Sequence, residues 1–286
     1  VLDNKKKLRV NFGDNVPQSL STIISVGTSA GGARAKAVIA FNEKTKDVRS
    51  GQIAAPEGYS HWLIKLDGVT NNALGDPKYY GLIEYAYYQL AIRAGITMAE
   101  SRLLEEGGRS HFLTKRFDRV GSNEKLHVQT LCGLAHFDYR MLRAYSYEQL
   151  FEVMRFLKLP YNQQEEMFRR MVFNIVARNQ DDHTKNTSFI MNRLGEWSLS
   201  PAYDLTWAFN PSGEWTASHQ LSIGNKWDDF THADLVDFGR RCDINRPEDI
   251  IKQVKEAVSM WETIARELSI PETQVRRIEK TLRLSR

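Results

Sequence analysis

Residues 167–207 constrain the fold of this 286-residue chain more than any other stretch. Apolar side chains recur there with the 3.6-residue period that predicts a helix with one face in the core. These side chains belong to Met167, Phe168, Met171, Val172, Ile175 and Val176. A polar loop follows at 179–186, and then two short β-type runs, 187–192 and 196–199. This order predicts a core helix, a polar loop and a β-hairpin.

The expected hairpin would bring separated polar residues together. If its turn centres near Leu194, antiparallel pairing places Asn186 opposite about Ala202, and Asp204 then returns close to the polar loop that holds Asp181. Carboxylate and amide oxygens are ligands that hold Mg²⁺ together with substrate phosphates. A remaining carboxylate would orient a hydroxyl nucleophile. This arrangement predicts phosphoryl transfer, in which positioning and charge neutralisation do most of the catalysis.

The polar loop resembles a sequence pattern of the HipA family of bacterial toxin kinases. The shared pattern is N-x-D-x-H-x-K-N, which here comprises Asn179, Asp181, His183, Lys185 and Asn186. The run P-A-Y-D-L follows it at 201–205. Such polar residues are usually turn formers and helix caps. The spacing and the returning P-A-Y-D-L run favour a functional site.

The resemblance implies a role for each residue of this pattern. Asp181 would be the catalytic aspartate, and Asn186 and Asp204 would be the Mg²⁺ ligands. Asp182, directly beside Asp181, shows how ambiguous a single aspartate is in such a loop. The positions of the pattern that would bind ATP are His183, Lys185, Asn186, Tyr203 and Asp204.

A loop rich in glycine and serine lies upstream, at 27–36. Such a loop lets backbone amides approach phosphate oxygens, because no side chains block the approach. Its pattern, G-x-S-x-G-G-x-R-x-K, resembles the phosphate-covering loop of the HipA family. The resemblance implies that a serine here, Ser29, is a regulatory phosphosite that switches the kinase off. The implied ATP-binding residues are Gly31, Gly32, Ala33, Arg34, Ala35 and Lys36.

An alternating run at 61–66 predicts a half-buried strand that ends near Lys65. Lys65 is a candidate to neutralise nucleotide phosphates, although a lysine at a strand end is more often a surface residue. A helix is expected over 77–94, with Gly95 as its C-terminal cap. This helix resembles the family's E-x-x-x-x-x-L-A-x-x-x-G-I pattern. Its acid, Glu84, would hold Lys65 in place.

A further strand is expected at 110–117, and it ends in K-R-F-D-R. Members of the HipA family have a similar R-F-D-R where the chain links the two lobes and backbone groups meet adenine. The resemblance therefore implies nucleotide contacts at Lys115, Arg116 and Phe117. Many members have Glu in place of Lys115, so any contact at that position is expected from the backbone.

Composition supports an enzyme of this size. With 42% hydrophobic residues, the chain can bury one large core or two modest ones. A formal charge of +4 is far below that of a dedicated nucleic-acid binder. The two cysteines form no metal or disulfide pattern. No apolar run approaches the ~20 residues that span a bilayer, so we expect no membrane partner and a cytoplasmic location. The first residue is Val, which suggests a piece of a longer protein.

These patterns together predict an α+β, bilobal, protein-kinase-like fold. We expect a β-rich N-lobe at 1–118 and a mostly helical C-lobe at 119–286. The reaction would transfer the γ-phosphoryl group of ATP, with Mg²⁺, to a serine or threonine hydroxyl of a protein. The family resemblance implies a target such as an aminoacyl-tRNA synthetase. It also implies a helix-turn-helix antitoxin of HipB type, with DNA reached only through that antitoxin.

Two other classes of function remain open from the sequence. A small-molecule phosphotransferase could use the same Asp, Asn and Asp chemistry, and only its acceptor would differ. A catalytically idle DNA co-repressor subunit is the other alternative. The intact acidic residues argue against the second class.

Overall fold

The structure is a computed structural model that describes residues 9–11, 35–68, 79–106, 108–121 and 123–285. It divides into two compact units. Unit 1 comprises Val1–Tyr85 and Ala99–Leu126, and unit 2 comprises Ala86–Met98 and His127–Arg286. The division falls inside helix α3 (Tyr80–Arg93). The lobe limits of 1–118 and 119–286 stay a prediction.

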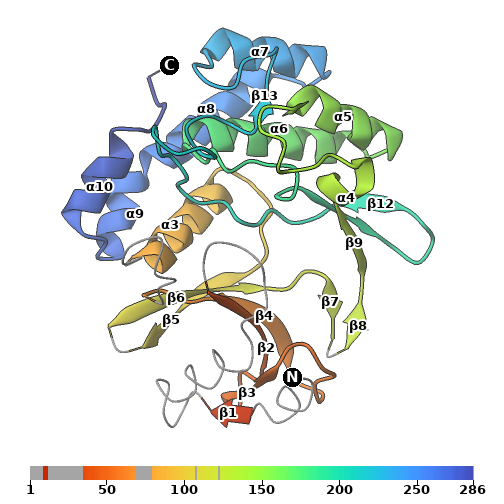
Figure 1. Cartoon of the computed structure of the whole chain (residues 1–286), viewed down its shortest axis with the longest axis vertical. Coiled ribbons are helices and arrows are strands. Elements are labelled where there is room, and N and C mark those ends of the chain that lie inside the picture. Colours follow the sequence, from red (N-terminus) through yellow and green to blue (C-terminus); the bar gives the residue numbers. More distant parts are fainter. Residues whose placement is uncertain (1–8, 12–34, 69–78, 107, 122, 286) are drawn as a thin grey trace. The chain divides into compact units, whose positions relative to one another are not determined.

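Unit 1 is built on a six-stranded sheet in the order β1-β3-β2-β4-β6-β5 (Figure 1). All neighbouring strands in it are antiparallel. The strands are β1 (Arg9–Asn11), β2 (Lys36–Phe41), β3 (Asp47–Ser50), β4 (Ser60–Lys65), β5 (Ser101–Glu106) and β6 (Arg109–Lys115). A short hairpin of β7 (Arg119–Val120) and β8 (Glu124–Lys125) follows.

The strand expected at 61–66 is confirmed as β4, and its alternation sorts its side chains between two faces. Trp62 and Ile64 are buried in the apolar core of the sheet. His61, Leu63 and Lys65 point to the opposite face, because successive strand residues alternate. Helix α3 starts close to β6: a Cβ built on Gly81 would lie 1.9 Å from the Ser110 carbonyl oxygen, so only glycine fits there.

Unit 2 is mostly helical, and α6 (Tyr161–Val176) is the core helix expected from the sequence. α6 packs against α5 (Tyr147–Phe156) and α8 (Pro247–Ser259) (Figure 1). Its Phe168 stacks on Phe238, with ring centroids 6.4 Å apart. The remaining helices are α4 (Leu131–Ala135), α7 (His232–Arg241), α9 (Trp261–Glu267) and α10 (Glu272–Glu279).

Local capping residues set where two of these helices begin. Ser146 precedes α5, and its hydroxyl accepts a hydrogen bond from the Gln149 amide while the Gln149 side chain accepts one from the Ser146 amide. Thr231 and Asp234 form the same reciprocal arrangement at α7. These capping boxes satisfy backbone donors that a helix start leaves unpaired. None of the helices within the described ranges has both the length and the hydrophobicity of a bilayer-spanning segment.

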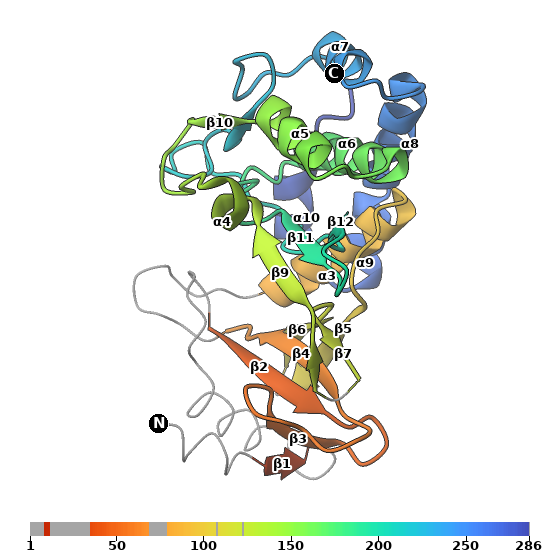
Figure 2. The same ribbon diagram turned by 90° about the vertical axis from the view of Figure 1, so that its right-hand side faces the viewer.

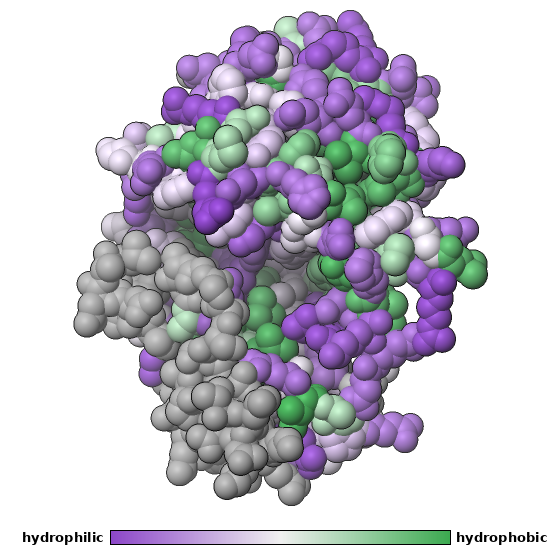
Figure 3. All heavy atoms as spheres, turned by 45° about the vertical axis from the view of Figure 1, so that its right-hand side comes forward, coloured by the Kyte–Doolittle hydropathy of each residue, from purple (hydrophilic) through white to green (hydrophobic). Residues whose placement is uncertain are grey.

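The hairpin predicted from the sequence is present in unit 2, as β11 (Ser188–Met191) and β12 (Trp197–Leu199). Its register pairs Phe189 with Leu199 and Met191 with Trp197, so the turn centres on Leu194 as expected. Strand β9 (His127–Thr130) completes a three-stranded sheet, in the order β12-β11-β9 (Figure 2). Two short strands, β10 (Tyr145–Ser146) and β13 (Leu221–Ser222), pair separately. On the face drawn in Figure 3, the surface is mostly hydrophilic, with apolar side chains in small groups.

Candidate active site

The polar loop after α6 is tied to the chain that follows the hairpin. The Gln180 amide donates to the Ala208 carbonyl at 3.0 Å, and the Ala208 amide donates to the Arg178 carbonyl at 3.1 Å. Asn179 and Ala208 thereby form a parallel bridge. Because Ala208 lies only four positions after Asp204, these bonds hold the returning segment against the start of the loop.

The loop brings Asp181, His183 and Asn186 together. The Asn186 side-chain nitrogen donates to the Asp181 carbonyl oxygen at 2.7 Å, and the Asn186 amide donates to the His183 carbonyl at 2.8 Å. His183 Nε2 lies 3.7 Å from an Asp181 carboxylate oxygen. The Asp181 side chain is 47% exposed, so a substrate hydroxyl could reach its carboxylate.

The side-chain oxygens of Asn186 and Asp204 are of the kind that fit a hard cation such as Mg²⁺. Because the Asn186 nitrogen is already engaged, its side-chain oxygen is the atom oriented to meet a cation. No group of three His, Cys, Asp or Glu side chains within the described ranges is arranged as a metal site. A set of one amide and one carboxylate is typical of Mg²⁺, which keeps water and phosphate oxygens as its other ligands.

Tyr203 anchors the segment that carries Asp204. Its hydroxyl donates to the Lys185 carbonyl at 2.7 Å and also contacts the Ser188 hydroxyl. Burial raises the pKa of the Tyr203 phenol above its usual range. The next residue, Asp204, has a φ of 54°, in the left-handed region that Asp adopts more readily than most residues.

The neighbouring residues Asp181 and Asp182 lie in different environments. Asp182 is buried, and its carboxylate accepts hydrogen bonds from the Tyr147 hydroxyl at 2.7 Å and from the Gln220 amide at 2.8 Å. The buried His219 ring lies 2.9 Å from it. Burial alone would raise the pKa of Asp182, but His219 and these donors lower it. Asp182 therefore holds the loop, and Asp181 is the accessible carboxylate.

In unit 1, Lys65 and Glu84 form the ion pair expected from the sequence. Lys65 Nζ lies 2.5 Å from a Glu84 carboxylate oxygen, and their side chains are 16% and 4% exposed. Lys36 of β2 stands directly opposite Lys65 of β4, so both lysines are on one face of the sheet. Like charges in such a cross-strand pair are destabilising. Glu84 offsets part of the repulsion between Lys36 and Lys65. An anion bound at this end of the two strands would reduce the repulsion further.

Two backbone amides of the segment 115–117 already donate hydrogen bonds to other residues of unit 1. The Lys115 amide donates to the Glu100 carbonyl and the Arg116 amide to the His61 carbonyl, each at 2.8 Å. A nucleotide could therefore use only carbonyl oxygens at these two positions. The Lys115 side chain pairs with Glu100 at 3.1 Å and lies over the Trp62 ring, on the face opposite to Lys65. Phe117 is half-buried.

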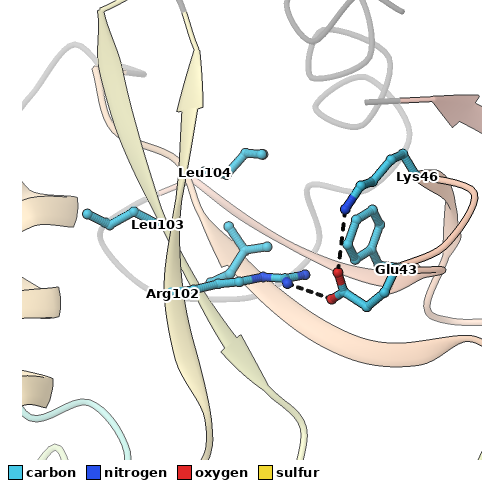
Figure 4. Close-up of a pocket in the computed structure, with 7 residues that line it drawn as sticks. Glu43, Lys46, Arg102, Leu103 and Leu104 are labelled. Carbon is cyan, nitrogen blue, oxygen red and sulfur yellow. Dashed lines mark ion pairs between the residues drawn. The ribbon is translucent and has the colours of Figure 1, made fainter. Parts of the chain in front are cut away.

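Two of the hollows of unit 1 are lined entirely by described residues. The larger of these two, about 300 Å³, is lined by Arg102, which pairs with Glu43 at 2.5 Å (Figure 4). The Arg102 guanidinium also packs over the Trp62 ring. This hollow faces the side of the sheet away from Lys65. The second, about 240 Å³, is lined by His61 of the Lys65 face. Its other lining residues are Gly51, Gln52, Ile53, Ala54, Arg119, Asn123 and Lys125.

Part of the expected phosphate loop lies outside the described residues. The predicted ATP contacts at Gly31, Gly32, Ala33 and Arg34 and the predicted phosphosite Ser29 fall there. Ala35 and Lys36 are described: the Ala35 carbonyl accepts from the Leu66 amide at 2.9 Å, and Lys36 begins β2.

Sequence reasoning missed the residues that position the polar loop at 179–186. Tyr147 and His219 reach Asp182 from 35 and 37 positions away along the chain. Asn174 continues the network by donating to the Tyr147 hydroxyl at 3.1 Å and accepting from Asn179 at 2.9 Å. No motif joins these positions. The one available signal was the run of polar residues, Ser218, His219 and Gln220, beside the apolar Leu221.

Comparisons with known proteins agree with this fold. The family model of the HipA-like C-terminal domain matches residues 28–261. A Haemophilus influenzae protein with a provisional kinase designation is 25% identical over 232 residues, covering 70% of this chain and 67% of that protein. A chain in the structure of Shewanella oneidensis MR-1 HipA with HipB and operator DNA superposes with a TM-score of 0.66. It is 16% identical, and the match covers 93% of this chain and 67% of that chain. The chain has a kinase-like α+β fold and belongs to the HipA-like C-terminal domain family.

Proposed function

We propose that this chain is an ATP-dependent serine/threonine protein kinase. The observation that carries the proposal is the contrast between two adjacent aspartates. Asp182 is buried in a hydrogen-bonded network, whereas Asp181 is half-exposed beside the oriented amide of Asn186. A loop held by one carboxylate while it presents the next is suited to orienting a nucleophile.

Each residue would have a defined part in the transfer. Asp181 would orient the acceptor hydroxyl and take its proton as the oxygen–phosphorus bond forms and the bond to ADP breaks. Lys65, held by Glu84, would bind the phosphates of ATP. The Asn186 amide oxygen and the Asp204 carboxylate would hold Mg²⁺, which when bound would neutralise charge on the transferred phosphoryl group.

The nucleotide would be bound further by the residues that the family pattern implies. These residues are Gly31, Gly32, Ala33, Arg34, Ala35, Lys36, Lys115, Arg116, Phe117, His183, Lys185 and Tyr203. In unit 1, the 240 Å³ hollow lies on the Lys65 face and next to residues 116–119, so we propose it for the adenosine end of ATP. Phosphorylation of Ser29 would repel the nucleotide phosphates and lower activity.

The proposed acceptor is a protein, such as an aminoacyl-tRNA synthetase, in a cytoplasmic toxin–antitoxin system. The Shewanella HipA structure contains HipB and operator DNA, and this supports a helix-turn-helix antitoxin as partner. DNA would then be contacted only through the antitoxin.

Incubation with γ-labelled ATP and a bacterial lysate tests the activity. We expect the wild type to label protein bands and Lys65→Met to lose labelling by about a hundredfold or more, because the phosphates lose a partly buried counter-charge. Lys46→Met is the matched control, since Lys46 is an exposed lysine of the same unit that pairs with Glu43. Label only on small molecules, or equal labelling by Lys65→Met, would contradict the proposal.

Calorimetry tests the Mg²⁺ site. We expect Asp204→Ala and Asn186→Ala to weaken Mg²⁺-ATP binding by about tenfold or more, because each removes an oxygen ligand. Chelation of Mg²⁺ with EDTA should lower wild-type affinity to the level of the variants. Asp237→Ala removes an exposed carboxylate of α7 and should bind like the wild type. Unchanged affinity in both site variants would remove these residues from the metal site.

A further inference from the structure

The loop at 136–144, between α4 and β10, is bound directly to the catalytic loop. The Thr184 hydroxyl donates to the Phe137 carbonyl at 2.8 Å. The Tyr139 ring lies 5.7 Å from the His183 ring, and Lys185 Nζ lies 3.6 Å from the centre of the Tyr139 ring. The position of this loop is therefore fixed relative to the residues that flank Asp181.

This loop presents apolar side chains to solvent. Met141 is 57% exposed and its neighbour Leu142 is 36% exposed. Behind them, Phe137 stacks on Tyr145 with centroids 4.5 Å apart. Single exposed apolar residues are ordinary, and here two stand in succession on a loop that is hydrogen-bonded to the loop holding Asp181.

The charge around the exposed pair is mainly positive. Arg140, Arg143 and Lys185 are exposed and outnumber the one carboxylate of the loop, Asp138. The Asp138 carboxylate is already engaged by the Arg140 guanidinium, at 2.8 Å. Arg143 therefore remains to attract an acidic group on a partner.

We propose that loop 136–144 is the docking shelf for the polypeptide acceptor of this kinase. Met141 and Leu142 contact a large apolar side chain of the acceptor, and Arg143 attracts an acidic one. A polypeptide is the expected occupant because small substrates need a concave pocket that covers most of their surface. The preferred acceptor is thus a serine or threonine in an exposed segment with apolar and acidic neighbours. This inference rests on the proposed protein kinase activity.

A library of short peptides with a central serine, varied at the flanking positions, tests the shelf. We expect the wild type to favour peptides with large apolar and acidic residues. The double variant Met141→Ser, Leu142→Ser should raise KM for these peptides about tenfold, with kcat and Mg²⁺-ATP affinity unchanged, because only acceptor contacts are lost. Arg143→Glu should abolish the preference for acidic residues.

Leu194→Ser is the control, because Leu194 is 83% exposed at the hairpin turn of the same unit. It should keep the wild-type KM and selectivity. The proposal of a docking shelf would be overturned by a double variant with wild-type KM and selectivity, or by a wild type that prefers basic peptides.

Fluorescence anisotropy with labelled peptides of the library separates this inference from the kinase proposal. If the wild type transfers no phosphate to any peptide or lysate protein, the kinase proposal fails. Peptide binding then tests the proposed docking shelf by itself. Tighter binding of acidic, apolar peptides by the wild type than by the double variant supports the proposal. Equal binding by the two, or no binding, overturns it.

Discussion

Asp181→Asn is expected to abolish phosphoryl transfer while leaving the fold intact. The substitution keeps the size of the side chain and removes the carboxylate that would orient the hydroxyl and accept its proton. General-base and positioning contributions of this kind amount to about 10²–10⁴-fold in rate. The carboxylate is half-exposed, so the free energy of unfolding should change by about 0.5 kcal/mol.

Single-turnover transfer of labelled phosphate, thermal unfolding and Mg²⁺-ATP calorimetry on one preparation would check this expectation. Nucleotide binding should largely persist. The informative control is Asp182→Asn, assayed at a temperature where it is folded. Near wild-type rates in Asp181→Asn, together with an inactive but folded Asp182→Asn, would show that the catalytic assignment is one residue out of register.

Local pattern was sufficient for the elements that surround the site. Helical periodicity identified α6, and the spacing of two β-type runs gave the hairpin register, centred on Leu194. The contact between Lys65 and Glu84 also followed from a strand and a helix with a family-like pattern. Each of these inferences depends on residues that are near in sequence or that share a motif.

Other features depend on long-range packing, which no local pattern encodes. The family pattern pointed to Asp181, but the sequence held no physical reason to prefer it to Asp182, because the difference lies in the approach of Tyr147 and His219 from distant segments. Nor could it show that the Lys115 and Arg116 amides are used by the sheet, since this depends on pairing with Glu100 and His61.

Asp182→Asn is expected to be the most destabilising single change in the catalytic loop. Its carboxylate is buried among Tyr147, His219 and the Gln220 amide. Hydrogen bonds to a buried charged group contribute about 1.5–3 kcal/mol, and the amide of the variant weakens those that the Tyr147 hydroxyl and the Gln220 amide donate. Urea unfolding at neutral pH should show a loss of this size. Asp181→Asn, the same substitution one residue earlier at a half-exposed position, should be nearly neutral.

The loss of unfolding free energy in Asp182→Asn should become smaller as the pH falls. The folded protein lowers the pKa of Asp182, against the effect of burial, through His219 and the donors around it. An unfolded aspartate has a pKa of about 3.9. The stabilisation by the carboxylate is therefore complete above about pH 5 and is lost as the pH falls through the lower folded pKa. The difference in unfolding free energy between wild type and Asp182→Asn should be largest near neutral pH and shrink in acid. A difference that stays constant from neutral pH into the acid range would show that the charge of Asp182 contributes nothing to the loop.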